Sequence, residues 1–228
     1  MQVKHYLDSL YPLQDSVLNS LSKLDLTFYL TGGTALGRYY LNHRFSDDLD
    51  FFFNRATDFQ KETQSAIEKL NQTFVVEVRV ESESYVQLMI QLKQLDLKVE
   101  FVNDVGYRYG QPLSTPLFPR TDHWRNILSN KITALSREAP KDIADIIFMS
   151  RSFAFNWVEI IREAGQKDSW INELEVFKMV DKYPIEKLSI VNWINEPNYP
   201  ELKSSLKTIA KDILLGGDNS LAKASPHV

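Results

Sequence analysis

The sequence predicts an α/β (α+β) protein, with helices on one face of a sheet in its N-terminal part and a mainly helical C-terminal part. Apolar and polar residues alternate over three successive segments, 74–80, 86–92 and 95–101, and this spacing of two is typical of half-buried strands. Residues 26–30 form a short apolar run that stops at a Gly-Gly pair, after which the spacing becomes helical. From residue 124 onward the patterning is almost entirely helical.

The other elements of the N-terminal part follow from local spacing. Residues 1–24 carry apolar side chains at helical spacing, and we expect Pro12 to break this helix. Helices are predicted at 34–42 and 59–70, on either side of a strand at 48–53. The three alternating segments are expected to form an antiparallel meander, with its apolar face packed on helices and its polar face available for a site.

A loop rich in Gly, Pro, Ser and Thr at 106–119 separates the two parts. We therefore expect a core domain at 1–115 and a helical C-terminal domain at 116–228. Residues 1–119 hold 11 basic and 15 acidic side chains, whereas residues 120–228 hold 15 of each. The acidic excess thus lies in the sheet part.

The composition excludes several classes of protein. The 228 residues include no cysteine, which rules out disulfide scaffolds, thiolate nucleophiles and cysteine-bound zinc. The net charge of −4 argues against a protein that coats nucleic acid non-specifically. No apolar run is long enough to span a bilayer and the N-terminus lacks the apolar core of a signal peptide, so we expect a cytoplasmic protein with no membrane partner.

The segment that carries chemistry combines a glycine turn with an acidic pair. Asp48 and Asp50 share one face of the predicted strand, and two like charges in so hydrophobic a run need a cation to hold them. Mg²⁺ (or Mn²⁺) suits this pair because a hard divalent ion takes oxygen ligands together with substrate phosphates. Gly32 and Gly33 let backbone N–H groups approach a triphosphate closely. The simpler alternatives are a tight turn without a ligand and an acidic pair that caps a helix or binds Arg44.

Three motifs carry a family resemblance: T-G-G-T-A-L at 31–36, H-R at 43–44 and S-x-D-L-D-F-F at 46–52. The sequence resembles the AbiEii/AbiGii-type toxins of bacterial toxin–antitoxin and abortive-infection systems, which belong to the DNA polymerase β-like nucleotidyltransferase superfamily. The resemblance implies a mixed sheet, with Asp48 and Asp50 on the catalytic metals and the two glycines on the nucleotide phosphates.

Glu100, in L-K-V-E-F-V, occupies the place where the family has a third carboxylate, which in many members is Asp. There it would bind the metal or position the attacking hydroxyl; alternatively, it pairs with a lysine. His43 near an acidic cluster is more often an orienting hydrogen-bond donor than a base. Ser46 either binds triphosphate or caps a turn. Altogether, six residues of this chain are expected to bind nucleotide: Gly32, Gly33, Thr34, Arg44, Ser46 and Lys131.

A second group of family matches lies on the helical side, at Lys131, Arg137, Lys141, Asp142 and Asp145. Lys131 shares a helical face with apolar residues, so its ammonium either meets a phosphate in a cleft or extends along its stem to water. Asp142 is expected to act in catalysis, or else it stabilises the first turn of its helix. Asp145 could pair with Lys141 four residues earlier, and Arg137 either forms a salt bridge or contacts phosphate or RNA.

These observations predict a metal-dependent nucleotidyltransferase that moves NMP from an NTP to a hydroxyl. The resemblance implies a toxin that modifies RNA, at the 3′ end of tRNA, and that a cognate antitoxin protein restrains. The alternatives are a small-molecule acceptor such as an aminoglycoside, a protein acceptor, and a non-catalytic nucleotide-binding module. The lysines at 203, 207 and 211 form either a solvated helix face or a guide for RNA phosphates. No P-loop or Rossmann motif occurs.

Overall fold

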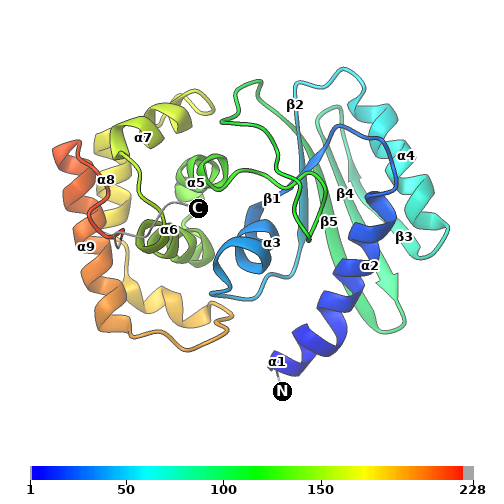
Figure 1. Ribbon diagram of the computed structural model, residues 1–228, viewed down its shortest axis with the longest axis horizontal. Coiled ribbons are helices and arrows are strands. Elements are labelled where there is room, and N and C mark those ends of the chain that lie inside the picture. The colour runs from blue at the N-terminus through cyan, green and yellow to red at the C-terminus, as the bar shows by residue number, and fades with distance from the viewer. Residues whose placement is uncertain (1, 223–228) are drawn as a thin grey trace. The chain divides into compact units, whose positions relative to one another are not determined.

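The computed structural model describes residues 2–222, except for the side chain of Gln2, and the chain forms two compact units with the boundary between His123 and Trp124. The first unit holds a five-stranded sheet and the second is helical (Figure 1). The helices of the first unit are α1 (Gln2–His5), η1 (Tyr6–Leu10), α2 (Tyr11–Leu21), α3 (Gly32–Ala35), η2 (Leu36–Leu41) and α4 (Phe59–Asn71). Its strands are β1 (Tyr29–Thr31), β2 (Leu49–Asn54), β3 (Val75–Glu81), β4 (Tyr85–Leu92) and β5 (Leu95–Asp104).

The sheet has the strand order β1-β2-β5-β4-β3. Strands β2 and β5 run parallel, whereas the other neighbouring pairs are antiparallel, so the sheet is mixed. This arrangement confirms the predicted fold class and the meander of its last three strands. The parallel pairing brings two segments 50 residues apart into register, with Asp50 opposite Glu100. Thr31 of β1 lies on the other side of Asp50.

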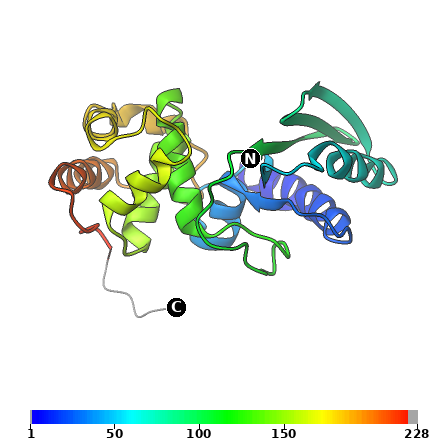
Figure 2. The ribbon, with the colours of Figure 1, turned by 90° about the horizontal axis from the view of Figure 1, so that it is seen from above.

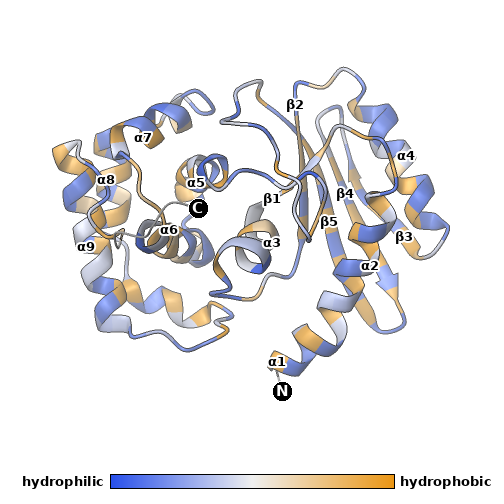
Figure 3. Cartoon of the chain, in the orientation of Figure 1, coloured by the Kyte–Doolittle hydropathy of each residue, from blue (hydrophilic) through white to orange (hydrophobic). Residues whose placement is uncertain are grey.

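One face of the sheet is apolar because every second residue of β2, β4 and β5 is buried. Helices α2 and α4 contact each other and lie on the same side of the sheet (Figure 2). Both are amphipathic, with hydrophobic and hydrophilic residues on different faces (Figure 3). The largest buried side chains of this unit include Phe28, Phe51, Phe53, Phe59, Phe101, Leu21 and Leu70. The polar residues of β2 and β5 are left on the opposite face of the sheet.

The expected break at Pro12 is wrong. Between α1 and α2 the chain makes a π-helical turn at Tyr6–Leu10, and the N–H of Tyr11 donates to the carbonyl of Tyr6. Pro12 is then the second residue of α2, where its fixed φ suits a helix. The helical course therefore continues through the proline.

The expectation that the segment 74–80 buries an apolar face is correct only at its start. Phe74 is buried, but Val78 and Val80 are 42% and 44% exposed. β3 is the edge strand, and its pairing with β4 shifts register between Val78 and Val80. Because β3 lies at the edge of the sheet and its pairing is irregular, the helices cover it less well than the central strands.

The C-terminal unit consists of α5 (Trp124–Thr133), η3 (Ala134–Arg137), α6 (Pro140–Ser152), α7 (Trp157–Gly165), α8 (Glu173–Asp181), η4 (Ile185–Ile190) and α9 (Tyr199–Leu215). α5 packs on α6 and α7, and α8 packs on α9. Trp157 is fully buried at the start of α7. Within residues 2–222, no helix combines the length and the apolar character needed to cross a membrane.

Candidate active site

Two strands bring acidic side chains to the polar face of the sheet. Asp48 immediately precedes β2, and Asp50 is its second residue. The β2–β5 register places Asp50 beside Glu100 and, one step earlier on the same face, Asp48 beside Lys98. The Nζ of Lys98 lies 3.1 Å from Oδ2 of Asp48 and 2.9 Å from Oε2 of Glu100. A cationic group thus bridges two of the three carboxylates expected to bind metal.

Glu100 accepts hydrogen bonds from three side chains, those of Tyr85, Gln87 and Lys98. Tyr85 donates a short hydrogen bond to its Oε1, and Gln87 Nε2 donates to the same oxygen at 3.0 Å. Burial by itself would raise the pKa of Glu100, but the hydrogen bonds from Tyr85, Lys98 and Gln87, with the charge of Lys98, outweigh it and lower the pKa to about 2. Glu100 is therefore ionised throughout the neutral range.

The same network shifts the pKa values of two of its hydrogen-bond donors, Lys98 and Tyr85. Burial would lower the pKa of Lys98, but Glu100 and Asp48 together raise it above its usual value. Burial and the hydrogen bond to Glu100 raise the pKa of Tyr85 to about 12. Lys98 is thus charged and Tyr85 protonated at neutral pH, so both can donate hydrogen bonds to the carboxylates.

The glycine turn lies against the acidic face. Gly32 has φ of +67°, and a Cβ at this position would lie 2.1 Å from Oδ2 of Asp50. Only glycine accepts both the backbone conformation and this approach. A Cβ on Gly33 would lie 2.8 Å from Nη2 of Arg44 and from Oγ of Ser46. The structure therefore brings together Gly33, Arg44 and Ser46, three of the residues expected to bind nucleotide.

Other side chains hold this turn in place. Thr34 is buried and donates a short hydrogen bond to the carbonyl oxygen of Asp48. Thr31 donates to Oδ2 of the buried Asp122 at 2.7 Å. His43 is also buried, in the segment that leads to Asp48. The hydrogen bonds of Thr31 and Thr34 fix the chain on both sides of the glycine pair.

A metal ion on this face would need several oxygen ligands close together. Within residues 2–222, no group of three or more His, Asp or Glu side chains lies close enough together to hold one as they stand. However, Asp48, Asp50 and Glu100 offer only carboxylate oxygens, the ligands that Mg²⁺ and Mn²⁺ take. The ammonium of Lys98 stands between Asp48 and Glu100, and its flexible four-carbon stem allows another cation to take its place. In its donor chemistry the face therefore fits a divalent ion.

The second group of predicted residues forms an ion cluster within the helical unit. The Nζ of Lys131 lies 2.7 Å from Oδ1 of Asp142 and 2.8 Å from Oδ2 of Asp145. All three side chains are at least nine-tenths buried, whereas Arg137, 3.5 Å from Asp142, is 69% exposed. Asp145 thus pairs with Lys131, which comes from α5, while Lys141 is exposed. Lys131 is neither at the surface nor in water, because its charge is matched inside the fold.

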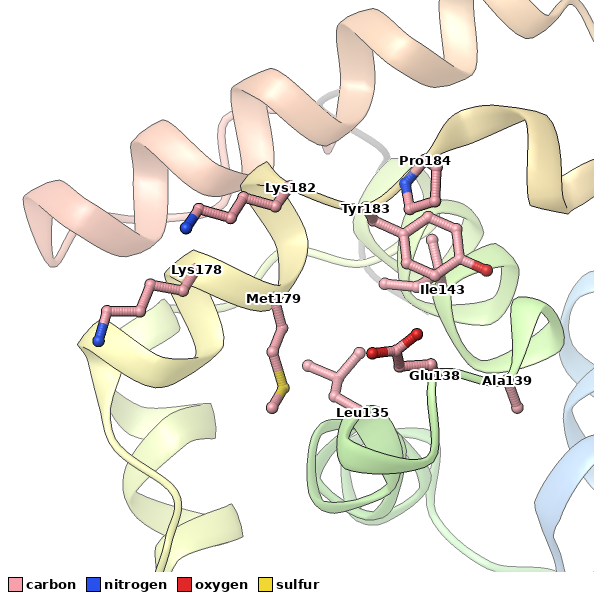
Figure 4. Close-up of a pocket in the computed structure, with 9 residues that line it drawn as sticks. All are labelled: Leu135, Glu138, Ala139, Ile143, Lys178, Met179, Lys182, Tyr183 and Pro184. Atoms are coloured by element: carbon pink, nitrogen blue, oxygen red, sulfur yellow. The ribbon is translucent and has the colours of Figure 1, made fainter.

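A pocket of about 280 Å³ lies beside this cluster (Figure 4). Leu135 and Met179 point toward one another across it, and the chains of Lys178 and Lys182 extend away. The hydroxyl of Tyr183 is buried and has no hydrogen-bond partner within residues 2–222. Burial, with the charges of Glu138 and Asp142, raises the pKa of Tyr183 to about 12. A mainly apolar lining of this kind is poorly suited to a triphosphate.

The residues that sequence reasoning missed are Lys98, Tyr85 and Gln87, which surround Glu100, and the buried Asp122. The alternation of β4 and β5 places the first three on the same face as Glu100, so the signal was present in the spacing. The lysines of α9 are all exposed, and Lys207 pairs with Asp181 at 2.8 Å. That pair favours a solvated helix face.

Comparison with known proteins shows the class to which this chain belongs. Two solved structures from Helicobacter pylori share the fold at 20% identity. One, a candidate nucleotidyltransferase, aligns with a TM-score of 0.63 over 95% of this chain and 96% of its own; the other, JHP933, aligns with a TM-score of 0.60 over 90% of each chain. No curated protein matches the sequence significantly. The fold and the family match together define a nucleotidyltransferase. The chain belongs to the family described as nucleotidyl transferase AbiEii toxin of type IV toxin–antitoxin systems, whose model matches residues 16–212.

Proposed function

We propose that this nucleotidyltransferase uses Mg²⁺ or Mn²⁺ to transfer NMP from an NTP to a hydroxyl of RNA, at the 3′ end of tRNA. The family match supports NTP as the substrate and a toxin's role with a cognate antitoxin. The single observation that supports the metal dependence is that the ammonium of Lys98 lies between Asp48 and Glu100, where a positive charge is bound. The metal, when bound, would neutralise charge on the triphosphate and activate the acceptor oxygen.

In this proposal Asp48, Asp50 and Glu100 hold the metal. Asp50 is bounded by Gly32 on one side and by Glu100 on the neighbouring strand, so its carboxylate has little freedom to move. The hydrogen bonds to Glu100 keep it ionised and oriented. Lys98 would leave its place between the carboxylates when the metal enters, and its ammonium would then be available to the incoming phosphates.

The nucleotide phosphates would lie against the glycine turn. Arg44 and Ser46 lie directly against Gly33, where a Cβ would be 2.8 Å from Nη2 of Arg44 and from Oγ of Ser46, so both side chains could donate to a phosphate at this turn. Arg44 supplies a planar set of donors that suits phosphate oxygens. Thr34 contributes by fixing the carbonyl of Asp48.

The roles of Lys131 and Asp142 in the reaction stay predictions. Their ion pairs join α5 to α6, and this supports a positioning role for both in the helical unit. A direct phosphate contact by Lys131 would require its ammonium to exchange two carboxylates for the phosphate.

The test is to incubate the purified protein with Mg²⁺, each α-³²P-labelled NTP and total bacterial RNA, and to trace the label on gels. We expect RNA to be labelled by the wild type and by Asp96→Asn, a control at an exposed carboxylate of β5, the strand that carries Glu100. Asp48→Asn and Asp50→Asn should lose activity by at least about 100-fold, because removing even indirect support of a metal costs 10- to 100-fold. Labelling that survives both substitutions, or that needs no divalent ion, would contradict the proposal.

The acceptor is tested in the same reactions. Label in tRNA that is removed by trimming its 3′ end would support the tRNA acceptor. If no RNA is labelled but pyrophosphate is released when an aminoglycoside or a protein is added, the acceptor belongs to one of those classes.

A further inference from the structure

A second pocket, with a polar lining, lies in the sheet unit, away from the carboxylate face. Its volume is about 340 Å³, and it is lined by Thr27, Tyr29, Phe53, Asn54, Ala56, Gly106, Arg108, Gly110, Gln111, Pro112 and Arg120. It lies at the far end of β2, because Asn54 is the last residue of that strand and Asp50 is near its beginning. Four residues of extended chain, roughly 13 Å, separate the two positions.

The loop after β5 places two arginines in this pocket. The N–H of Leu30 donates to the carbonyl of Arg120, and the N–H of Asp122 donates to the carbonyl of Leu30, so the end of the loop runs along β1. Arg108 lies with its guanidinium 4.9 Å from the centre of the Tyr29 ring. Both side chains are therefore held by the edge of the sheet.

Both guanidinium groups have few polar partners among the described residues. Arg108 donates from Nη2 to the side-chain oxygen of Gln111, and Arg120 donates from Nη2 to the carbonyl of Thr27. Over residues 2–222 neither has an ion-pair partner, and Nη1 of Arg108 and Nε of Arg120 are buried without any hydrogen-bond partner. Buried donors without acceptors cost free energy, which a bound acceptor would recover.

The surroundings make these unmatched charges unusual. Residues 1–119 carry an excess of four acidic side chains, yet none of the eleven described residues that line the pocket is acidic. Asp104 and Asp122 lie near Tyr29. Burial and the charge of Asp122 raise the pKa of Tyr29, so its hydroxyl is neutral and donates a hydrogen bond to Asn54. Arg55, which is exposed, packs its side chain on Gly106 and adds a third cation at the rim.

We propose that this pocket binds a phosphate group through Arg108 and Arg120. Two guanidinium groups that converge on one cavity match the oxygens of a phosphate, which accepts paired hydrogen bonds from arginine. The phosphate comes either from a free nucleotide or from the backbone of an RNA strand. The site is separate from the carboxylate face and requires no metal, so the proposal stands independently of the reaction.

The test measures binding to the full chain by titration calorimetry in EDTA, with inorganic phosphate, AMP and a short single-stranded RNA as probes. Arg108→Gln and Arg120→Gln should each weaken binding by at least about tenfold, because a hydrogen bond to a charged group contributes that much. Arg79→Gln is the matched control, since Arg79 is exposed on β3 and already paired with Glu77. Its binding should equal that of the wild type.

The probes separate the two sources of phosphate. If the substitutions weaken the binding of AMP but not of RNA, the phosphate comes from a free nucleotide. An effect on RNA, with a slope of log affinity against log salt reduced by about one, identifies the RNA backbone. Equal binding of all three probes by the arginine variants and the control would overturn the proposal.

A second measurement covers variants that fail to fold. In the wild-type protein, phosphate should shift the NMR signals of the Nε–H groups of Arg108 and Arg120 and leave that of Arg79 unchanged, whereas the same concentration of chloride should not. Unchanged signals for both pocket arginines at millimolar phosphate would also overturn the proposal.

Discussion

Replacing Lys98 with methionine removes the ammonium that lies between Asp48 and Glu100 while keeping a side chain of similar length. Two carboxylates then face each other without this cation, and Glu100 keeps only its other hydrogen bonds. We expect the variant to be less stable than the wild type in the absence of metal, and to gain more than the wild type does when Mg²⁺ is added.

The size of the effect follows from the pKa of Glu100. Its value falls from 4.5 to about 2, and at about 1.4 kcal/mol for each pKa unit this corresponds to roughly 3 kcal/mol in all. Tyr85, Lys98 and Gln87 share this contribution. Because the side chain of Lys98 is 31% exposed, solvent screening reduces its part to about 1 kcal/mol.

The sign of the pH dependence is also fixed. A carboxylate with a lowered pKa contributes stability above its unfolded value, near pH 4.5, and loses it as the pH falls toward 2. The raised pKa of Lys98 means that its contribution is present below pH 10.5 and is lost at higher pH. The difference between wild type and Lys98→Met should therefore be full at neutral pH and smaller at about pH 3.

The assay is urea denaturation in EDTA and in Mg²⁺, at both pH values, with Lys61→Met as the control. Lys61 is exposed on α4, away from the carboxylates. Its replacement should therefore change neither the stability in EDTA nor the gain in stability from Mg²⁺. The reasoning is refuted if Lys98→Met matches the wild type at neutral pH in EDTA and gains no more stability from Mg²⁺.

Two further substitutions test the turn and the ion cluster. Gly32→Ala and Gly216→Ala both place alanine at a positive φ, which costs about 1–2 kcal/mol, but only at Gly32 would the Cβ collide with Asp50. Gly32→Ala should therefore also reduce NMP transfer at least about tenfold, as measured with labelled NTP, and equal activity of the two variants would argue against the placement of Asp50. Lys131→Met leaves the buried carboxylates of Asp142 and Asp145 without their cation. The free energy of unfolding, measured in urea, should therefore fall by about 3–5 kcal/mol. A loss below about 1 kcal/mol would mean that the cluster does not form.

The acidic face could be predicted because its signal is local. The spacing of two in β5 and in the segment around Asp50 assigns side chains to a face, and the Gly-Gly pair marks the turn between strand and helix. The family motifs then indicated which face carries the chemistry.

Contacts that depend on long-range register could not be predicted. Lys98 is one of several polar residues on its face, and it meets Asp48 only because β5 pairs in parallel with β2 at one particular offset. Lys131 meets Asp145 because the chain turns between α5 and α6, and spacing along a single helix suggested Lys141 as the partner instead. The course of the helix at Pro12 depended on a π-helical turn that helical spacing does not reveal.

The central claim is that Asp48, Asp50 and Glu100 hold a divalent ion. The most direct measurement is a titration with Mn²⁺, followed by the EPR signal of the free ion, for the wild type, Asp50→Asn and the control Asp96→Asn. The account predicts that the wild type and the control bind Mn²⁺ alike and that Asp50→Asn binds it at least about 100-fold more weakly. Equal binding by all three proteins would contradict it.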